Sequence, residues 1–188
     1  MTHSGKRGTD ATGVNSGVPA EPEPWLRGTH SELDPIVRQF VHSMEQVEED
    51  VERWCAGLTD EDVNARPMGL AALAFHLRHI ARSLDRLLSY AEGTQLDATQ
   101  IALLKTEMEE GSTLTGVLHE LRTALAEAKR RARALKPEQY QHERAVGRKR
   151  LPTTVGSLLV HSAEHTQRHL GQAIITAKVV MAMREQQP

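Results

Sequence analysis

Apolar residues recur every three or four positions in four separate segments of this chain, and that spacing limits the fold more than any other feature. A period of 3.6 residues places apolar side chains on one face of an α-helix, whereas a half-buried strand alternates at every second residue. The segments cover approximately residues 34–58, 70–91, 113–135 and 154–183. In the first, the apolar positions are Val37, Phe40, Val41, Met44, Val47, Val51, Trp54 and Leu58. Because no segment alternates as a strand does, we expect an all-α fold.

Capping and helix-breaking residues mark the ends of these helices. The expected caps and stops are Asp34 with Pro35, Gly93, Ser112 or Thr113, and Thr153 or Thr154. Residues 97–110 are expected to form a short extra helix. Residues 136–152 contain Pro137, Gly147 and Pro152 and are expected to form a loop. Four amphipathic helices of about 20–30 residues bury their apolar faces most simply in a four-helix bundle.

Composition and charge are those of one ordinary cytoplasmic domain. The chain has 188 residues, a formal net charge of −2 and a single cysteine, Cys55, so we expect no internal disulfide and no nucleic-acid partner. No run approaches the ~20 apolar residues of a membrane helix, and no secretory signal is expected. Residues 1–30 are rich in Gly, Thr, Ser and Pro. We expect them to be a disordered tail, with Trp25 and Leu26 able to dock onto a bundle formed by residues 31–186.

Histidines are the residues most able to carry chemistry here, since the chain has ten of them but only two each of Phe, Trp and Tyr. His161, His165 and His169 follow one another at four-residue spacing on the fourth helix, and a helical wheel places them on its inward stripe. Two imidazoles at i and i+4 can reach one metal ion, although a buried histidine can equally be a hydrogen-bonded core residue. The second helix offers His76, near its apolar stripe, and His79, away from it. The spacing alone leaves both open as a third ligand.

The sequences "HLRHIA" around His79 and "HTQRHLGQ" from His165 resemble the DinB-like superfamily, over about residues 34–183. This resemblance implies a four-helix bundle of up-down-down-up order in which His79, His165 and His169 hold one divalent transition metal ion, Zn, Ni or Fe. The residues expected around these ligands, as ring-orienting or pocket groups, are His76, His161, Glu164 and Gln172. The iron-binding bundle of ergothioneine sulfoxide synthases is also similar. Those enzymes carry a further catalytic domain, so a module that needs a partner is a further alternative.

What the resemblance implies for function is a metal-dependent enzyme with a small-molecule substrate. We expect a transferase that joins a low-molecular-weight thiol to an electrophilic compound, or a hydrolase; the alternative is a non-catalytic metal-binding or stress-related bundle. A homodimer would suit a bundle of this size. Arg148, Lys149 and Arg150 are candidate contacts for an anionic substrate. Cys55 is expected to be a packing residue rather than a nucleophile. The histidine pair lacks the glutamate of the metalloprotease HExxH motif.

Overall fold

The structure is a computed structural model that describes residues 21–186, and most of these residues are helical. The α-helices are α1 (Pro35–Cys55), α2 (Asp60–Asn64), α3 (Leu73–Glu92), α4 (Ala98–Lys105), α5 (Leu114–Ala134) and α6 (Val155–Glu185). The 3-10 helices are η1 (Pro24–Leu26), η2 (Pro67–Gly69) and η3 (Pro137–Gln139), and the strands are β1 (Glu143–Val146) and β2 (Leu151–Thr154). The predicted helical character of the chain is therefore confirmed, including the short extra helix between the second and third long ones.

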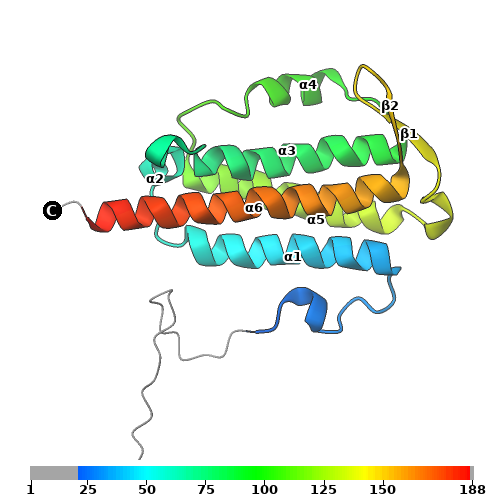
Figure 1. The fold of residues 1–188 in the computed structure, drawn as a ribbon, viewed down its shortest axis with the longest axis horizontal. Helices are drawn as coiled ribbons and strands as arrows, with labels where there is room; N and C mark the ends of the chain where they lie inside the picture. Colours follow the sequence, from blue (N-terminus) through cyan, green and yellow to red (C-terminus); the bar gives the residue numbers. More distant parts are fainter. Residues whose placement is uncertain (1–20, 187–188) are drawn as a thin grey trace, which may run out of the picture.

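The four long helices lie side by side, and the core fills the space between them (Figure 1). Helix α3 packs against α5 and α6, and α1 packs against the same two helices from the other side. The largest fully buried side chains come from all four, among them Phe40, Met44, Leu77, Ile80, Leu84, Leu121, Leu125 and Leu159. The spacing that predicts the helices thus also selects the residues that are removed from water.

The helix ends follow the predicted signals. The Asp34 side chain accepts a hydrogen bond from the Ile36 amide, and Pro35 occupies the first turn of α1. Thr113 and Thr154 cap α5 and α6 with their hydroxyls. Helix α3 stops at Gly93, whose φ of +91° is the left-handed conformation that glycine adopts without a steric penalty.

The prediction of a loop over residues 136–152 and of an all-α chain is wrong in one respect, because strands β1 and β2 form a short antiparallel hairpin. Glu143 pairs with Thr154 and Val146 pairs with Leu151. Pro152 predicts a break in regular structure, but a two-stranded sheet consists of edge strands only, and proline is tolerated there. Strands of four residues with partly exposed side chains on both faces also give almost no hydrophobic alternation to detect.

The start of the chain differs from the predicted tail where the structure describes it. Residues 1–20 lie outside the described residues, but residues 21–33 run along α1. Arg27 donates to both carboxylate oxygens of Glu49 on α1, at 2.5 and 2.8 Å. Trp25 and Leu26 are more than half exposed. The segment is attached instead by the buried Pro24 and by polar contacts, those of Arg27 with Glu49, Thr29 with His42 and His30 with Glu45.

Within residues 21–186, no helix combines the length and the apolar character that crossing a membrane requires.

Candidate metal centre

Three histidines from two helices meet about midway along the bundle of long helices. His79 lies on α3, and His165 and His169 lie one turn apart on α6. One ring nitrogen from each lies within 4.8 Å of the other two, and Nε2 of His79 is 2.9 Å from Nε2 of His165. Helix α3 lies along α6, which explains why residues 86 positions apart in sequence reach the same place.

The histidines lie at the edge of the core rather than inside it. On this part of α6, Ser162, Thr166 and Leu170 are buried, while His165 and His169 are only partly buried. The predicted inward stripe is buried at residues such as Leu158, Ser162 and Ala173, but the histidines lie at its edge rather than within it. This offset leaves the three rings between the core and solvent, where a small molecule can approach them.

A buried carboxylate orients His79. Glu107, in the connection between α4 and α5, is only 5% exposed. Its Oε2 lies 2.7 Å from Nδ1 of His79, and its Oε1 accepts a hydrogen bond from Nη1 of Arg86 at 2.6 Å. Burial alone would raise the pKa of Glu107, but the hydrogen bonds from His79 and Arg86 outweigh it and leave this pKa below its usual value. An ionised Glu107 holds the proton of His79 on Nδ1 and turns Nε2 toward His165 and His169.

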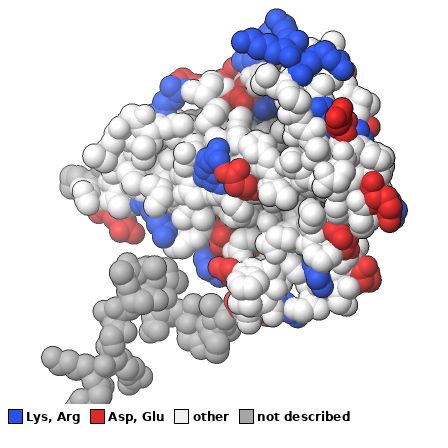
Figure 2. All heavy atoms as spheres, turned by 45° about the vertical axis from the view of Figure 1, so that its right-hand side comes forward, with Lys and Arg blue, Asp and Glu red and all other residues white. Residues whose placement is uncertain are grey.

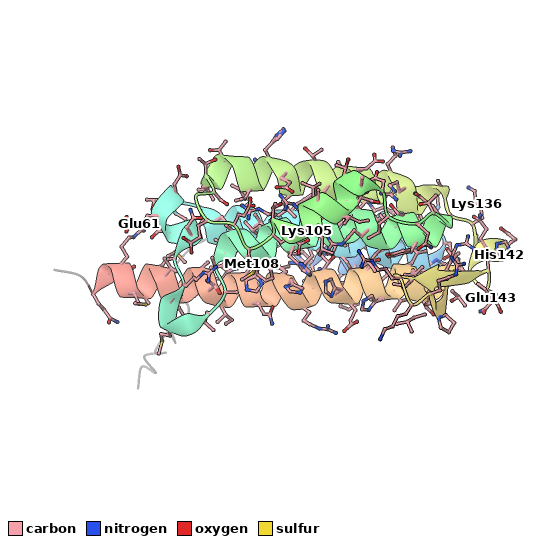
Figure 3. The ribbon with its side chains drawn as sticks, turned by 90° about the horizontal axis from the view of Figure 1, so that it is seen from above. Glu61, Lys105, Met108, Lys136, His142 and Glu143 are labelled. Carbon is pink, nitrogen blue, oxygen red and sulfur yellow. The ribbon has the colours of Figure 1, made fainter. Side chains whose placement is uncertain are left out.

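Arg78 holds the α4–α5 connection, which carries Glu107, in place. Its Nη1 donates to the backbone carbonyls of Thr106, Glu107 and Glu109 at 3.0–3.2 Å, and its Nη2 bonds the Ser112 hydroxyl. In Figure 3 the labelled Lys105 and Met108 flank this part of the connection, where it passes over α3. Neither Glu107 nor Arg78 was predicted as a functional residue, because a carboxylate in a connection carries no periodic signal that ties it to a helix.

His76 contacts the cluster from outside. Its Nδ1 lies 3.2 Å from Nδ1 of His169, and its ring is almost fully buried at 5% exposure. His76 does not belong to the group whose ring nitrogens all lie within 4.8 Å of one another, whereas His79 does. Since His76 occupies the outer nitrogen of His169, the Nε2 of His169 is the nitrogen left for a ligand.

The three histidines around His79 are neutral at neutral pH. Burial first, and then repulsion from neighbouring histidines, lowers the pKa of His76, His165 and His169 to about 4. A neutral imidazole is the form that binds a metal ion, because a protonated ring has no free lone pair. The donor set fits a divalent transition metal: three imidazole nitrogens from His79, His165 and His169 converge, and His79 and His169 each have a partner on the other ring nitrogen.

A groove of about 550 Å³ opens beside His76, between the start of α3 and the second half of α6. Its walls are mostly apolar and include Phe75, Leu70 and Ile175, with the backbone of Gly171 exposed on one side. The Phe75 ring also stacks against His79 at 5.5 Å. The groove is thus continuous with the side chains that surround the three histidines.

Of the other residues predicted around the ligands, only Gln172 lines this groove together with His76. His161 is half exposed and lies 3.3 Å from Glu164, which also pairs with Arg168. The His161 and His165 rings are 5.6 Å apart, so His161 is a neighbour of the cluster without being part of it.

The predicted anion contacts lie away from the cluster. Arg148, Lys149 and Arg150 form the exposed turn of the hairpin, and Figure 2 shows a group of Lys and Arg side chains at the top of the molecule, where Figure 1 places this turn. Strand β2 ends at Thr154, eleven residues before His165, which is about 16 Å along α6. The structure therefore does not bring these three side chains to the histidines.

Cys55 is buried at the end of α1, as the sequence predicts. Burial raises the pKa of its thiol to about 11, so the reactive thiolate is scarce at neutral pH. This environment agrees with a packing role.

Comparison with known proteins relates this chain to a family. The family model of the DinB superfamily matches residues 17–173. Among solved structures, a conserved protein from Enterococcus faecalis superposes with a TM-score of 0.65 at 19% sequence identity, covering 80% of this chain and 99% of that one. At this identity the similarity shows the fold alone. No curated protein matches the sequence.

Proposed function

The chain belongs to the DinB superfamily, and from this premise we propose that it is a metal-dependent enzyme in which His79, His165 and His169 hold one divalent transition metal ion. The observation that carries the proposal is the meeting of one nitrogen from each of these rings within 4.8 Å. The fold proposed with it is the four-helix bundle of up-down-down-up order that the resemblance implies.

Three protein ligands, and not four, distinguish a catalytic metal site from a structural one. Among the described residues, no fourth His, Cys, Asp or Glu joins the group. When bound, an ion of this kind supplies Lewis acidity, which lowers the pKa of a coordinated thiol or water. Glu107 and His76 contribute as partners of the outer nitrogens of His79 and His169. With the protons on those outer nitrogens, the inner nitrogens are free to bind the ion.

The substrate that we propose is an electrophilic small molecule, to which a low-molecular-weight thiol is transferred. The apolar groove beside His76 supports this choice, because Phe75, Leu70 and Ile175 offer a wall for a carbon skeleton and no charged group of their own. Arg168 at its edge is already paired with Glu164. The partially exposed histidines let a second, polar reactant enter from solvent.

The first experiment measures metal content by mass spectrometry on tag-free protein purified without chelator. Wild type is expected to hold about one equivalent of transition metal more than His165→Ala. His119→Ala is the matched control, because His119 is exposed on α5 and lies outside the cluster. Equal metal in wild type and His165→Ala, also after titration, would refute the site.

A screen of thiols against electrophilic compounds then tests turnover. Thiol consumption by wild type that is lost in His165→Ala supports the transferase. Metal bound at the three histidines without consumption of any thiol would instead favour the alternative, a binding protein without turnover.

A further inference from the structure

A second group of metal-ligating side chains lies where residues 21–33 pass over α1. His30 belongs to that segment, and His42 and Glu45 belong to α1. Nε2 of His30 lies 2.7 Å from Oε1 of Glu45, and the His30 and His42 rings are 5.6 Å apart. One ligand atom from each of the three lies within 4.8 Å of the other two.

The helix and the segment bring these side chains together by separate means. His42 and Glu45 are three residues apart on α1 and therefore share a face. The ion pair of Arg27 with Glu49 fastens the segment one turn further along the same helix. His30 itself has a φ of +58°, a conformation that residues other than glycine seldom adopt.

The three side chains of this cluster differ in their exposure to solvent. His42 is 4% exposed, and its Nε2 lies 3.1 Å from the Thr29 hydroxyl. The side chains of His30 and Glu45 are about a quarter exposed. A ligand bound between the three would have protein on one side and solvent on the other.

Charge also favours a cation at this place. Glu45 has no Lys or Arg as an ion-pair partner among residues 21–186, since its only contact of this kind is with His30. The neighbouring Glu49 is neutralised by Arg27. The Glu45 carboxylate can only accept, so Nε2 of His30, 2.7 Å away, carries a proton that a metal ion would replace. On the outer side of His30, Nδ1 lies 3.9 Å from the Glu32 carboxylate, which favours a proton on Nδ1 once Nε2 binds the ion.

We propose that His30, His42 and Glu45 form a second metal site, for one Zn²⁺ or similar borderline transition-metal ion, which fastens the segment before α1 to that helix. Two imidazoles and a carboxylate are a zinc donor set. With bonds of about 2.1 Å, tetrahedral ligand atoms lie about 3.4 Å apart. His30 and Glu45 therefore have to separate by less than 1 Å from their hydrogen-bonded distance.

The competing explanation for the closeness of these side chains is that they only hydrogen-bond one another. A zinc titration distinguishes this explanation from a metal site. The starting protein is the full chain with His165→Ala and His169→Ala, which removes two ligands of the other cluster. After chelator treatment, this variant is expected to take up about one equivalent of Zn²⁺ by calorimetry. That equivalent is expected to disappear when His30→Gln or Glu45→Gln is added, and neither change empties a buried position.

Glu49→Gln is the matched control in the same background. It removes the ion pair with Arg27 but no proposed ligand, so zinc uptake is expected to persist. A second readout is amide hydrogen exchange of Leu33, whose N–H bonds the His30 carbonyl at 3.0 Å. Zinc is expected to slow this exchange in the starting protein and in Glu49→Gln, but not in Glu45→Gln.

Two results would overturn the proposal: no zinc uptake by the starting protein, or uptake that survives both His30→Gln and Glu45→Gln. The proposed enzyme site is tested with the complementary variant, in which the second site is removed instead. A His30→Gln/Glu45→Gln protein with His79, His165 and His169 intact is expected to keep its own equivalent of zinc, so the two sites fail or hold separately.

Discussion

Replacing Glu107 by glutamine tests how much of the candidate centre depends on a residue outside the three histidines. The carboxylate of Glu107 accepts from Nη1 of Arg86 at 2.6 Å and lies 2.7 Å from Nδ1 of His79. Glutamine keeps the size of the side chain but has one acceptor oxygen and an NH₂ group. In Glu107→Gln the amide can accept from Arg86 only if its NH₂ faces Nδ1 of His79, where it either opposes the Nδ1 proton or moves that proton to Nε2.

The structure allows two magnitudes to be estimated. The side chains of Glu107 and Arg86 are 6% and 12% exposed, so the lost bond to a charged group is expected to lower the free energy of unfolding by about 2 kcal/mol. His79 loses an anionic partner on its outer nitrogen, which makes Nε2 less basic and its orientation less fixed. A change of this kind is expected to weaken metal binding by about 10–100-fold.

Urea unfolding of the metal-free protein measures the first effect, and competition for Zn²⁺ with a chromophoric chelator measures the second. Glu120→Gln is the matched control. Glu120, on α5, pairs at 2.7 Å with Arg82, which lies one turn before Arg86 on α3, but Glu120 does not contact His79. Glu120 is 35% exposed, so a loss below about 1 kcal/mol and unchanged zinc affinity are expected. If Glu107→Gln lost stability but kept wild-type zinc affinity, Glu107 would be a structural residue and the reasoning would be refuted.

Three further perturbations address other parts of the molecule. Arg78→Met removes the donor to three carbonyls of the α4–α5 connection and is expected to cost about 3 kcal/mol in urea unfolding. Burial raises the pKa of Cys55 to about 11, so its thiol is expected to react with a thiol reagent at pH 8 only as fast as the chain unfolds. The measured reaction rate is therefore expected to rise when urea is added. Burial lowers the pKa of the histidines at the centre to about 4, below an unfolded value of about 6.5. The unfolded chain therefore binds more protons, and metal-free protein is expected to lose stability as the pH falls from about 6.5 to 4, measured by urea unfolding at each pH.

Local sequence determines the long helices of this chain, and they could be predicted. The apolar period selects the buried face of α1 through residues such as Val41 and Met44, and Asp34 with Pro35 sets its start. The hairpin could not be predicted in this way. Its stability comes from cross-strand pairing between Glu143 and Thr154 at one end and Val146 and Leu151 at the other, and such pairing leaves no pattern in either short strand.

The same contrast separates the two histidine clusters. His165 and His169 are neighbours on one helix, so their spacing alone indicates that they can share a ligand. His30 and His42 are twelve residues apart, on either side of the Asp34 cap. They meet only because the segment before α1 turns back along that helix and is fastened by Arg27. A cluster of this kind depends on a path of the backbone that periodicity cannot supply.

The choice between His76 and His79 shows why a helical wheel is insufficient for a site at the edge of a core. The wheel ranks positions by distance from the apolar stripe and places His76 nearer to it than His79; His76 is indeed the more buried ring. Burial alone does not select a ligand, because a metal site needs ring nitrogens that reach one common point. His79 meets that condition because the α4–α5 connection covers the polar side of α3 and brings Glu107 to its outer nitrogen. A loop thus turns an off-stripe histidine toward His165 and His169, while the more deeply buried His76 is left to support His169 from behind.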